Sequence, residues 1–325
     1  MTRRAGNART PGDATRILCA TDLLPRSDAA LERAAILADS LDASLHVLHV
    51  VAPSQSDNAI EHQLERAIAS MKARVTAPRW KFSVNPQAEV TVGSPTQRIV
   101  KAMQETGAGL VVLGPHRRRG VREALTGSIA EKVLSTRKVP LLIVQQEPRG
   151  PYRNIVLALD LSPVSAAAVR AAESLLMLPQ VSSIALHACQ PPYEGRLAFA
   201  GVGTETLDAY GAEWARRGEM AVRDFLKEHS ADFTRYRVVV AKGRPATAVL
   251  DATRRVRADL LVMGTHGRSR LGRILLGSVA TEVLHSVGCD VLIVPDGEMR
   301  PVRRQRSAAR KRGRSSSTQR MVTAA

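Results

Sequence analysis

The 325-residue chain is poor in aromatic residues and in cysteine. Aromatic side chains make up 3% of it, so any core must be built mainly from alanine, valine, leucine and isoleucine. Its three cysteines, Cys19, Cys189 and Cys289, form no CxxC pair and provide no disulfide framework, which favours a reducing compartment. Cys19 and Cys189 lie in apolar runs typical of strands, where we expect small core residues.

Long hydrophobic runs are also missing. No apolar run approaches the ~20 residues that a membrane helix needs. The first residues, MTRRAGNARTPGDATR, lack the apolar stretch of a secretory signal. We therefore expect a cytoplasmic protein with no membrane partner.

Acidic residues are scarce relative to basic ones. There are 47 lysines and arginines against 30 acids, a formal net charge of +17, which predicts polyanionic partners such as nucleotides or nucleic acid. Residues 301–325 hold eight lysines and arginines and no acid. We expect residues 1–14 and the tail 297–325 to be disordered.

Two interpretations of the basic tail stay open. Arginine-rich segments can bind nucleic acid by neutralising phosphates, but the charge is equally consistent with a solvated extension. No aromatic residue lies between the arginines, so stacking on bases is not expected.

The chain repeats itself. Shifted by 150 positions, residues 90–144 match residues 240–294 at 19 of 55 positions, where chance would give about three. Earlier in each copy a shift of 138 aligns Asp22 with Asp160. The difference between the two shifts means that the second copy holds twelve extra residues between these regions. A Pro/Gly-bearing stretch, QEPRGPYR, joins the copies.

Each copy alternates short apolar runs with helical segments, which predicts a parallel sheet covered by helices on both faces. The expected fold class is therefore α/β, with two tandem, doubly wound, five-stranded parallel sheets. Helices are expected over 164–178, 206–229, 245–257 and 278–287 in the second copy. Expected strands are 16–22, 44–51, 87–93, 109–114, 140–145, 154–160, 182–189, 235–243, 259–264 and 290–295.

The ends of two strands in the second copy indicate a ligand site. In open parallel sheets, ligands bind beyond the carboxyl ends of the strands, where the strand order reverses. Asp160 ends the first strand of this copy and Gly264 ends the fourth. If these strands are neighbours, the two residues face one crevice.

A glycine pattern follows the fourth strand. Gly264, Gly267, Gly277 and Ser278 form Gly-x2-Gly-x9-Gly-Ser. Glycines let backbone N–H groups approach a phosphate, and a helix amino terminus attracts anions. Arg268 adds positive charge. The pattern is neither a Walker loop nor GxGxxG. It predicts phosphate binding, and the alternative is a surface turn followed by an ordinary helix cap.

These motifs resemble the universal stress protein family, as a tandem member with domains over about 15–146 and 152–296. The resemblance implies a Rossmann-like fold, similar to adenine nucleotide alpha hydrolases, that binds ATP with or without Mg²⁺. It implies that Asp160 contacts the adenosine. It implies that Met263, Gly264 and His266 line the pocket. It also implies that Gly267, Gly277 and Ser278 hold the phosphates, with Val279 adjoining. Ala280 stands where many relatives carry a hydroxyl.

His266 also has a simpler interpretation as a solvated loop residue. No second ligand lies at metal spacing from it, so no metal site is expected.

The first copy is altered. Asp22, Gly114, Gly127 and Ser128 are present, but Arg117 replaces the second glycine. Its side chain disfavours the tight turn and could occupy the place of the phosphates, which predicts a degenerate site. Two alternatives are that the arginines there hold another anion, or that this copy survives for packing alone.

The fifth strand of each copy would be an uncovered sheet edge. The resemblance implies pairing through this strand, so we expect a pseudo-dimer within one chain, and a homodimer of whole chains is a further expectation. The predicted function is an ATP-binding stress-response regulator in the cytosol, not an enzyme, although slow ATP hydrolysis stays open. The alternatives are a nucleotide-free interaction scaffold and a nucleic-acid-associated protein acting through its tail.

Overall fold

The computed structural model describes residues 16–54, 56–77, 84–115, 129–136, 139–175, 181–265 and 276–296. The amino-terminal segment 1–14 and the tail 297–325, both expected to be disordered, lie outside these residues. Within the described part, no helix combines the length and the apolar character needed to cross a membrane.

The first half of the chain alternates strands and helices as the sequence predicts. Its first, fourth and fifth strands are each buried at all but one residue, as expected of a parallel sheet covered on both faces. Pro25 and Pro95 stand at the beginnings of two of its helices, where a missing N–H costs nothing. The strands are β1 (Arg16–Ala20), β2 (Ser44–Val51), β3 (Gln87–Val92), β4 (Leu110–Leu113) and β5 (Leu141–Ile143). The helices are α1 (Pro25–Leu41), α2 (Asp57–Val75), α3 (Pro95–Thr106) and α5 (Ile129–Ser135).

The second half repeats the order. Its strands are β6 (Asn154–Ala158), β7 (Ser182–Cys189), β8 (Tyr236–Lys242), β9 (Leu260–Gly264) and β10 (Asp290–Val294). Its helices are α6 (Pro163–Leu175), α7 (Glu194–Phe199), α8 (Thr204–His229), α9 (Pro245–Arg255) and α10 (Ser278–Ser286), with a 3₁₀ turn η1 (Phe233–Arg235) before β8. The predicted α/β class is confirmed.

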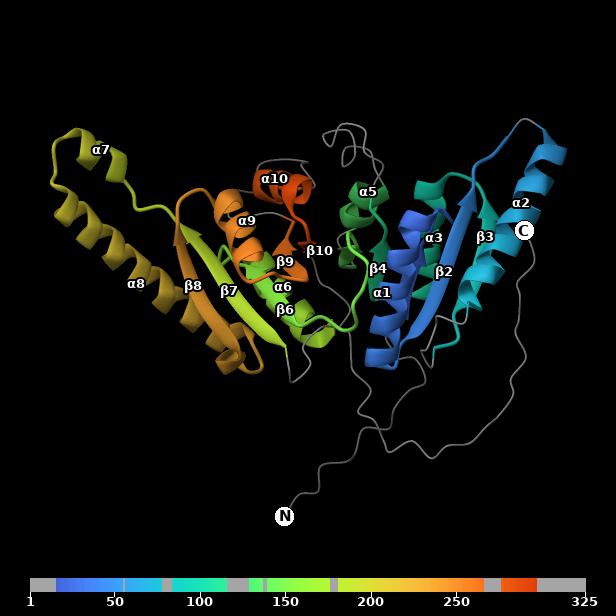
Figure 1. The fold of residues 1–325 in the computed structure, drawn as a ribbon, viewed down its shortest axis with the longest axis horizontal. Helices are drawn as coiled ribbons and strands as arrows, with labels where there is room; N and C mark the ends of the chain where they lie inside the picture. Colours follow the sequence, from blue (N-terminus) through green and yellow to red (C-terminus); the bar gives the residue numbers. More distant parts are fainter. Residues whose placement is uncertain are drawn as a thin grey trace, which may run out of the picture.

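All the strands form one sheet of ten, in the order β3-β2-β1-β4-β5-β10-β9-β6-β7-β8 (Figure 1). Strands within each half are parallel. The halves meet where β5 and β10 pair antiparallel, with Leu142 opposite Leu292 at the centre of the pairing. The expected pseudo-dimer through the fifth strands is therefore confirmed, and each half covers the edge that the other would expose.

Two apolar layers enclose this sheet, one on each face. Successive side chains of β1 alternate between them: Ile17 and Cys19 join one layer, and Leu18 and Ala20 the other. Each layer includes residues from both halves, so the seam is continuous with the core. The layers consist mostly of alanine, valine, leucine and isoleucine, as predicted. Cys189 differs from expectation: it is partly exposed, because it lies at the end of β7.

A buried polar network crosses the seam. The Arg33 Nε donates to Asp290 Oδ2 at 3.2 Å, and the guanidinium lies 3.9 Å from the centroid of the Tyr152 ring. The Tyr152 hydroxyl donates to the same carboxylate at 2.7 Å, and the Gln145 N–H donates to Asp290 Oδ1 at 2.8 Å. The network joins α1, the connecting segment and β10, so it holds the linker against both halves.

The second half carries an extension that the first lacks. Helix α7 was not predicted; it precedes α8, and in Figure 1 both project beyond the sheet at one end of the molecule. Only Val222 and Leu226 of α8 are buried. The extra residues found in the sequence comparison therefore form a helical projection rather than an enlarged core.

Candidate functional site

The two strand ends singled out by sequence are neighbours. Strand β6 pairs with β9 in parallel, with Ala158 opposite Met263. Asp160 follows β6 by two residues, and Gly264 is the last residue of β9. Strand order reverses between these strands, since β7 follows β6 on one side and β10 follows β9 on the other. The condition set by the sequence, that these two strands are neighbours, is therefore met, and the crevice between their ends stays a prediction.

The Asp160 carboxylate is held by the serines that follow it. Its Oδ1 accepts hydrogen bonds from the Ser162 and Ser165 hydroxyls, both at 2.6 Å. The Ser162 Oγ also accepts the Ser165 N–H at 3.3 Å, which caps the start of α6. Leu161 has a φ of 63°, so the chain turns sharply between the strand and the helix. The carboxylate is therefore oriented before any ligand arrives.

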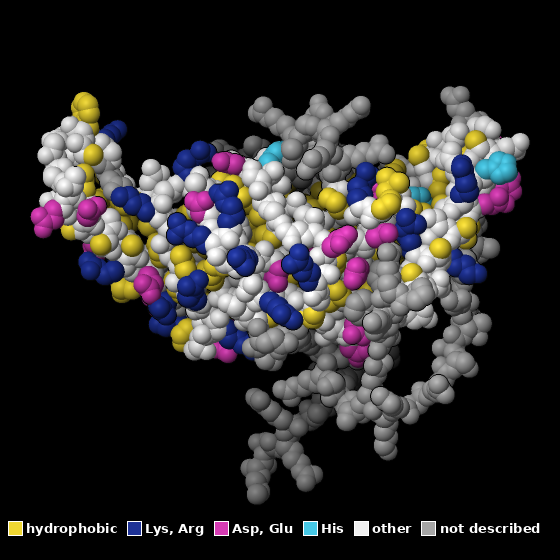
Figure 2. Space-filling model, viewed as in Figure 1, with side chains coloured by type: hydrophobic (Ala, Val, Ile, Leu, Met, Phe, Trp, Pro, Cys, Tyr) yellow, Lys and Arg dark blue, Asp and Glu magenta, His cyan; other side chains and the backbone are white. Residues whose placement is uncertain are grey.

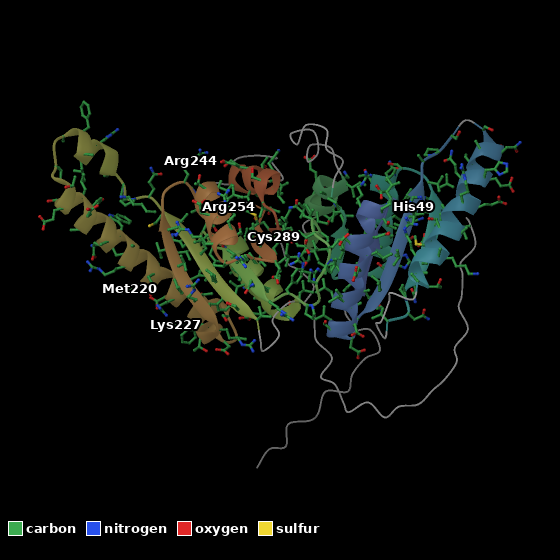
Figure 3. The ribbon with its side chains drawn as sticks, viewed as in Figure 1. His49, Met220, Lys227, Arg244, Arg254 and Cys289 are labelled. Carbon is green, nitrogen blue, oxygen red and sulfur yellow. The ribbon has the colours of Figure 1, made fainter. Side chains whose placement is uncertain are left out.

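A histidine on the neighbouring strand supports the same loop. The His187 Nδ1 lies 2.8 Å from the Leu159 carbonyl oxygen, which can only accept, so Nδ1 carries the proton. The first half repeats this contact between His49, labelled in Figure 3, and the Thr21 carbonyl at 2.8 Å. Because the aligned histidines make the same contact, they serve the shared fold rather than a difference between the halves.

The amino terminus of α10 lies beside the end of β9. Gly277 is its first flanking residue and has no side chain that could cap the helix. The Gly277 N–H donates to the Thr265 carbonyl at 2.7 Å, which fixes the helix start against the strand end. Ser278 is exposed and Val279 is partly buried. The N–H groups of this first turn have no partner within the helix, which is the arrangement that attracts anions.

Met263 is a core residue in this structure. It is 4% exposed and belongs to the same core layer as Ala280, which is 2% exposed. Gly264, between Met263 and Thr265, is partly exposed at the edge. His266, Gly267 and Arg268 lie outside the described residues, so their predicted roles stay predictions.

In the corresponding loop of the first half, an arginine side chain pairs with the aspartate. Asp22 accepts hydrogen bonds from the Ser27 hydroxyl at 2.6 Å and the Leu24 N–H at 3.0 Å, and its second oxygen pairs with Arg26. Burial raises the pKa of the Asp22 carboxyl, but these hydrogen bonds and the Arg26 charge outweigh it, so its pKa lies below its usual range. In the second half Val164 stands where Arg26 does. The sequence analysis did not single out Arg26, although the alignment at a shift of 138 positions shows the difference between Arg26 and Val164.

Gly114, at the end of β4, is required by close packing. A Cβ there would lie 3.2 Å from the Ser27 Oγ and 3.3 Å from the Ser27 Cα, so a side chain would require the start of α1 to shift by a few tenths of an ångström. Arg117, Gly127 and Ser128 lie outside the described residues. Among the residues that are described, no group of three or more His, Cys, Asp or Glu could hold a metal ion.

Comparison with known proteins identifies the family of this chain. The model of the Universal stress protein family matches twice, over residues 14–145 and 151–295. The chain belongs to the universal stress protein family. A universal stress protein of Mycobacterium tuberculosis is 27% identical over 237 residues, covering 70% of this chain and 74% of its own. One from Mycolicibacterium smegmatis is 26% identical, covering 86% of this chain and 96% of its own.

Solved structures of this family share the fold. A universal stress protein from Archaeoglobus fulgidus gives a TM-score of 0.61 at 17% identity, covering 87% of this chain and 97% of its own. A putative universal stress protein from Pseudomonas aeruginosa gives 0.58 at 19% identity, covering 88% and 94%. The tandem, Rossmann-like organisation is thus that of other universal stress proteins.

Proposed function

We propose that the second half of this universal stress protein binds ATP in the crevice between the ends of β6 and β9. One observation carries the proposal. The oriented Asp160 carboxylate and the uncapped amino terminus of α10 lie at the carboxyl ends of adjacent strands, where the strand order reverses. A carboxylate suits the hydroxyls of a ribose, and a helix amino terminus suits a phosphate.

The residues divide by chemistry. Asp160 would accept hydrogen bonds from the nucleoside. Gly264 and His266 would line the pocket, with Met263 as its floor. Gly267, Arg268, Gly277 and Ser278 would hold the phosphates, with Val279 adjoining. Mg²⁺ would arrive with the phosphates, since the described residues offer it no cluster of ligands.

We further propose that the protein acts as a cytosolic, nucleotide-gated regulator rather than a fast enzyme. The Asp160 oxygen that accepts from Ser162 and Ser165 is engaged in orienting its own loop. That arrangement supports recognition of a ligand rather than proton transfer. In the first half, Arg26 neutralises Asp22, which supports a degenerate site there.

The test is to denature the purified protein, separate what is released by chromatography, and titrate the emptied protein with ATP by calorimetry. Adenine nucleotide in the released material, or one ATP bound per chain, is expected. Absence of both would reject the proposal and favour a nucleotide-free interaction scaffold.

A further inference from the structure

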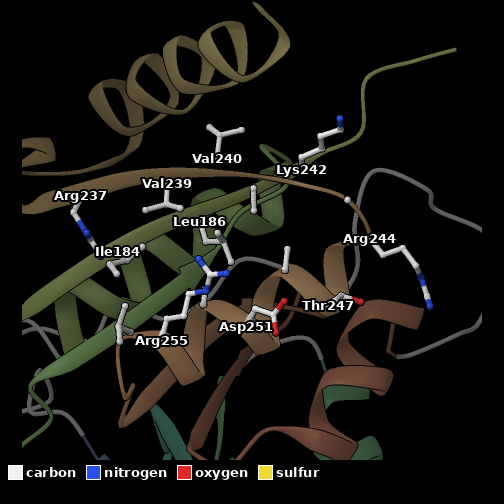
Figure 4. Close-up of a pocket in the computed structure, with 15 residues that line it drawn as sticks. Ile184, Leu186, Arg237, Val239, Val240, Lys242, Arg244, Thr247, Asp251 and Arg255 are labelled. Atoms are coloured by element: carbon white, nitrogen blue, oxygen red, sulfur yellow. The ribbon is translucent and has the colours of Figure 1, made fainter. Parts of the chain in front are cut away.

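A concavity lies between α9 and the two outer strands of the second half (Figure 4), and none of its lining residues belongs to the proposed nucleotide site. Its volume is about 860 Å³, within the range of ordinary small-molecule sites. Ile184 and Leu186 of β7 and Val239 of β8 form an apolar floor, and Ala248 and Ala252 of α9 form the wall. We call this the α9 groove.

The α9 groove exists because the outermost strand is only half covered. Helix α8 packs against β8 on the other face, whereas α9 packs against β7 and β6. The face of β8 that carries Val239 and Ala241 is therefore left beside α9 without a helix above it.

In the first half the same place is filled by polar side chains. The His46 Nε2 lies 2.9 Å from Glu89, and the Arg98 Nε donates to the Val92 carbonyl at 2.9 Å while its side chain covers Gly93. The aligned residues of the second half are Ile184, Val239 and Ala248. Replacing three polar side chains by smaller or apolar ones opens the α9 groove without changing the backbone plan.

The rim of the groove is basic. Arg237 and Arg255 lie toward one end of it, and Lys242 and Arg244 toward the other (Figure 4). Figure 2 shows lysine and arginine side chains spread over the second half, with apolar and acidic side chains among them. None of the four has a basic counterpart in the first half, where the aligned residues are Gln87, Glu105, Val92 and Ser94.

The acidic residues near the groove are already engaged. Asp251 pairs with Arg254 at 2.7 Å, and Glu282 lies 3.1 Å from Arg244. Arg237 and Arg255 are exposed and lie at the same end, where they would pair with an anionic head group. The groove thus has an apolar floor between two basic ends, and at one of these ends Arg244 already pairs with Glu282. This arrangement fits a ligand that is apolar along its length and carries its anionic group at the end formed by Arg237 and Arg255.

We infer that the α9 groove binds an elongated apolar carboxylate, of the chemical class of fatty acids. Its apolar chain would lie on Ile184, Leu186 and Val239, and its carboxylate would meet Arg237 and Arg255. The tail of the same chain is excluded as an occupant by its charge, since residues 301–325 carry eight basic residues and no acid. The site is separate from the proposed nucleotide crevice, so neither depends on the other.

The first experiment titrates the full-length protein with dodecanoate by calorimetry, below the concentration at which dodecanoate forms micelles. Saturable binding of one dodecanoate is expected. Ala248→Arg, which copies Arg98 of the first half, should fill the groove and abolish binding. Ala221→Arg adds the same charge to an exposed position of α8, on the opposite face, and should bind as the parent does. No binding to the parent, or equal binding to both variants, overturns the inference.

The second experiment tests the head group. Arg237→Ala combined with Arg255→Ala should weaken dodecanoate binding about tenfold or more, because charge-assisted hydrogen bonds are lost. Arg170→Ala, an exposed charge on α6, is the matched control and should have no effect. Dodecanol, which has the same chain without the charge, should bind the parent as weakly as dodecanoate binds the double variant.

A membrane surface also offers apolar chains beside an anionic head group, there a phosphate rather than a carboxylate. Vesicles containing phosphatidylglycerol should not retain the protein in a flotation assay, since the α9 groove is proposed to take a free fatty acid. Retention on vesicles without binding of free dodecanoate would overturn the inference in favour of a membrane contact. Unchanged melting temperatures of all variants would confirm that each is folded.

Discussion

The two halves of the chain share a backbone plan and differ in the side chains that close or open its concavities. Both have an aspartate after the first strand, a turn at positive φ, and a histidine that supports that loop. In the first half, Arg26 engages the aspartate and Arg98 fills the groove beside the outer strands. In the second, Val164 and Ala248 stand at these positions. The difference teaches that one backbone plan can carry open or filled concavities, depending on a few side chains at equivalent positions.

The largest expected effect concerns the amino terminus of α10. Gly277→Asp would place a negative side chain where the phosphates are proposed to lie, and we expect the affinity for ATP to fall at least ~100-fold. Calorimetry measures it. The aligned variant Gly127→Asp in the first half is the control and should bind ATP like the parent. Equal loss in both variants would contradict the assignment of the site to one half.

Stability should depend strongly on the network at the seam. Asp290→Ala leaves the Arg33 guanidinium buried without its carboxylate, and we expect it to lower the free energy of unfolding by about 3–5 kcal/mol. Urea denaturation followed by circular dichroism measures this. Asp224→Ala removes an exposed partner of Lys227 and should cost less than ~1 kcal/mol. Similar costs for the two variants would show that the buried network does not stabilise the seam.

A smaller effect should follow from removing the two aligned aspartates. Asp160→Ala should weaken ATP binding about tenfold, the loss expected when a hydrogen bond to a charged group is removed. Asp22→Ala should leave the affinity unchanged, since Arg26 already pairs with that carboxylate. If Asp22→Ala weakened binding as much, the first half would have to be regarded as a second nucleotide site.

The smallest expected effect concerns Arg26 and the pKa of the Asp22 carboxyl. Arg26→Val makes the first half resemble the second, and it should raise the pKa of the Asp22 carboxyl toward its ordinary value. A carboxyl with a lowered pKa adds stability that is present above its unfolded pKa and is lost as the pH falls through its folded pKa. In the variant this acid-dependent loss should shrink by less than ~1 kcal/mol, because Asp22 is partly exposed to solvent. An NMR titration of Asp22 that shows no change would contradict the role given to Arg26.

Much of this fold could be predicted from the sequence because its periodicity is strong. Alternating apolar runs and helical segments predicted the strand and helix positions, and the repeat predicted two similar halves. These features depend on local pattern, which a single sequence carries. The rule for open parallel sheets placed Asp160 and Gly264 at one edge on the condition that their strands are neighbours. The pairing of the halves through their fifth strands was implied by the resemblance to the family.

The contacts between segments distant in the sequence could not be predicted. Arg33 and Asp290 are 257 residues apart, and nothing in either neighbourhood indicates that they meet. Helix α7 was not predicted, because six residues are too few to show a helical period. The α9 groove was missed because it depends on side chains that fill a space in one half and are absent from the other.

The joining of β5 to β10 within one polypeptide has a consequence for how the two halves can change. In a dimer of identical chains, every residue at the contact must fit its own symmetry copy. Here each half always pairs with a half of different sequence, so an ion pair can be present on one side of the contact alone. Arg33 and Asp290 form such a pair, whereas Ala171 and Pro140 occupy the equivalent positions on the other side. Assembly of the sheet is also independent of protein concentration, because the partner is tethered. Because the two halves are covalently linked, the surfaces by which they meet need not be copies of each other.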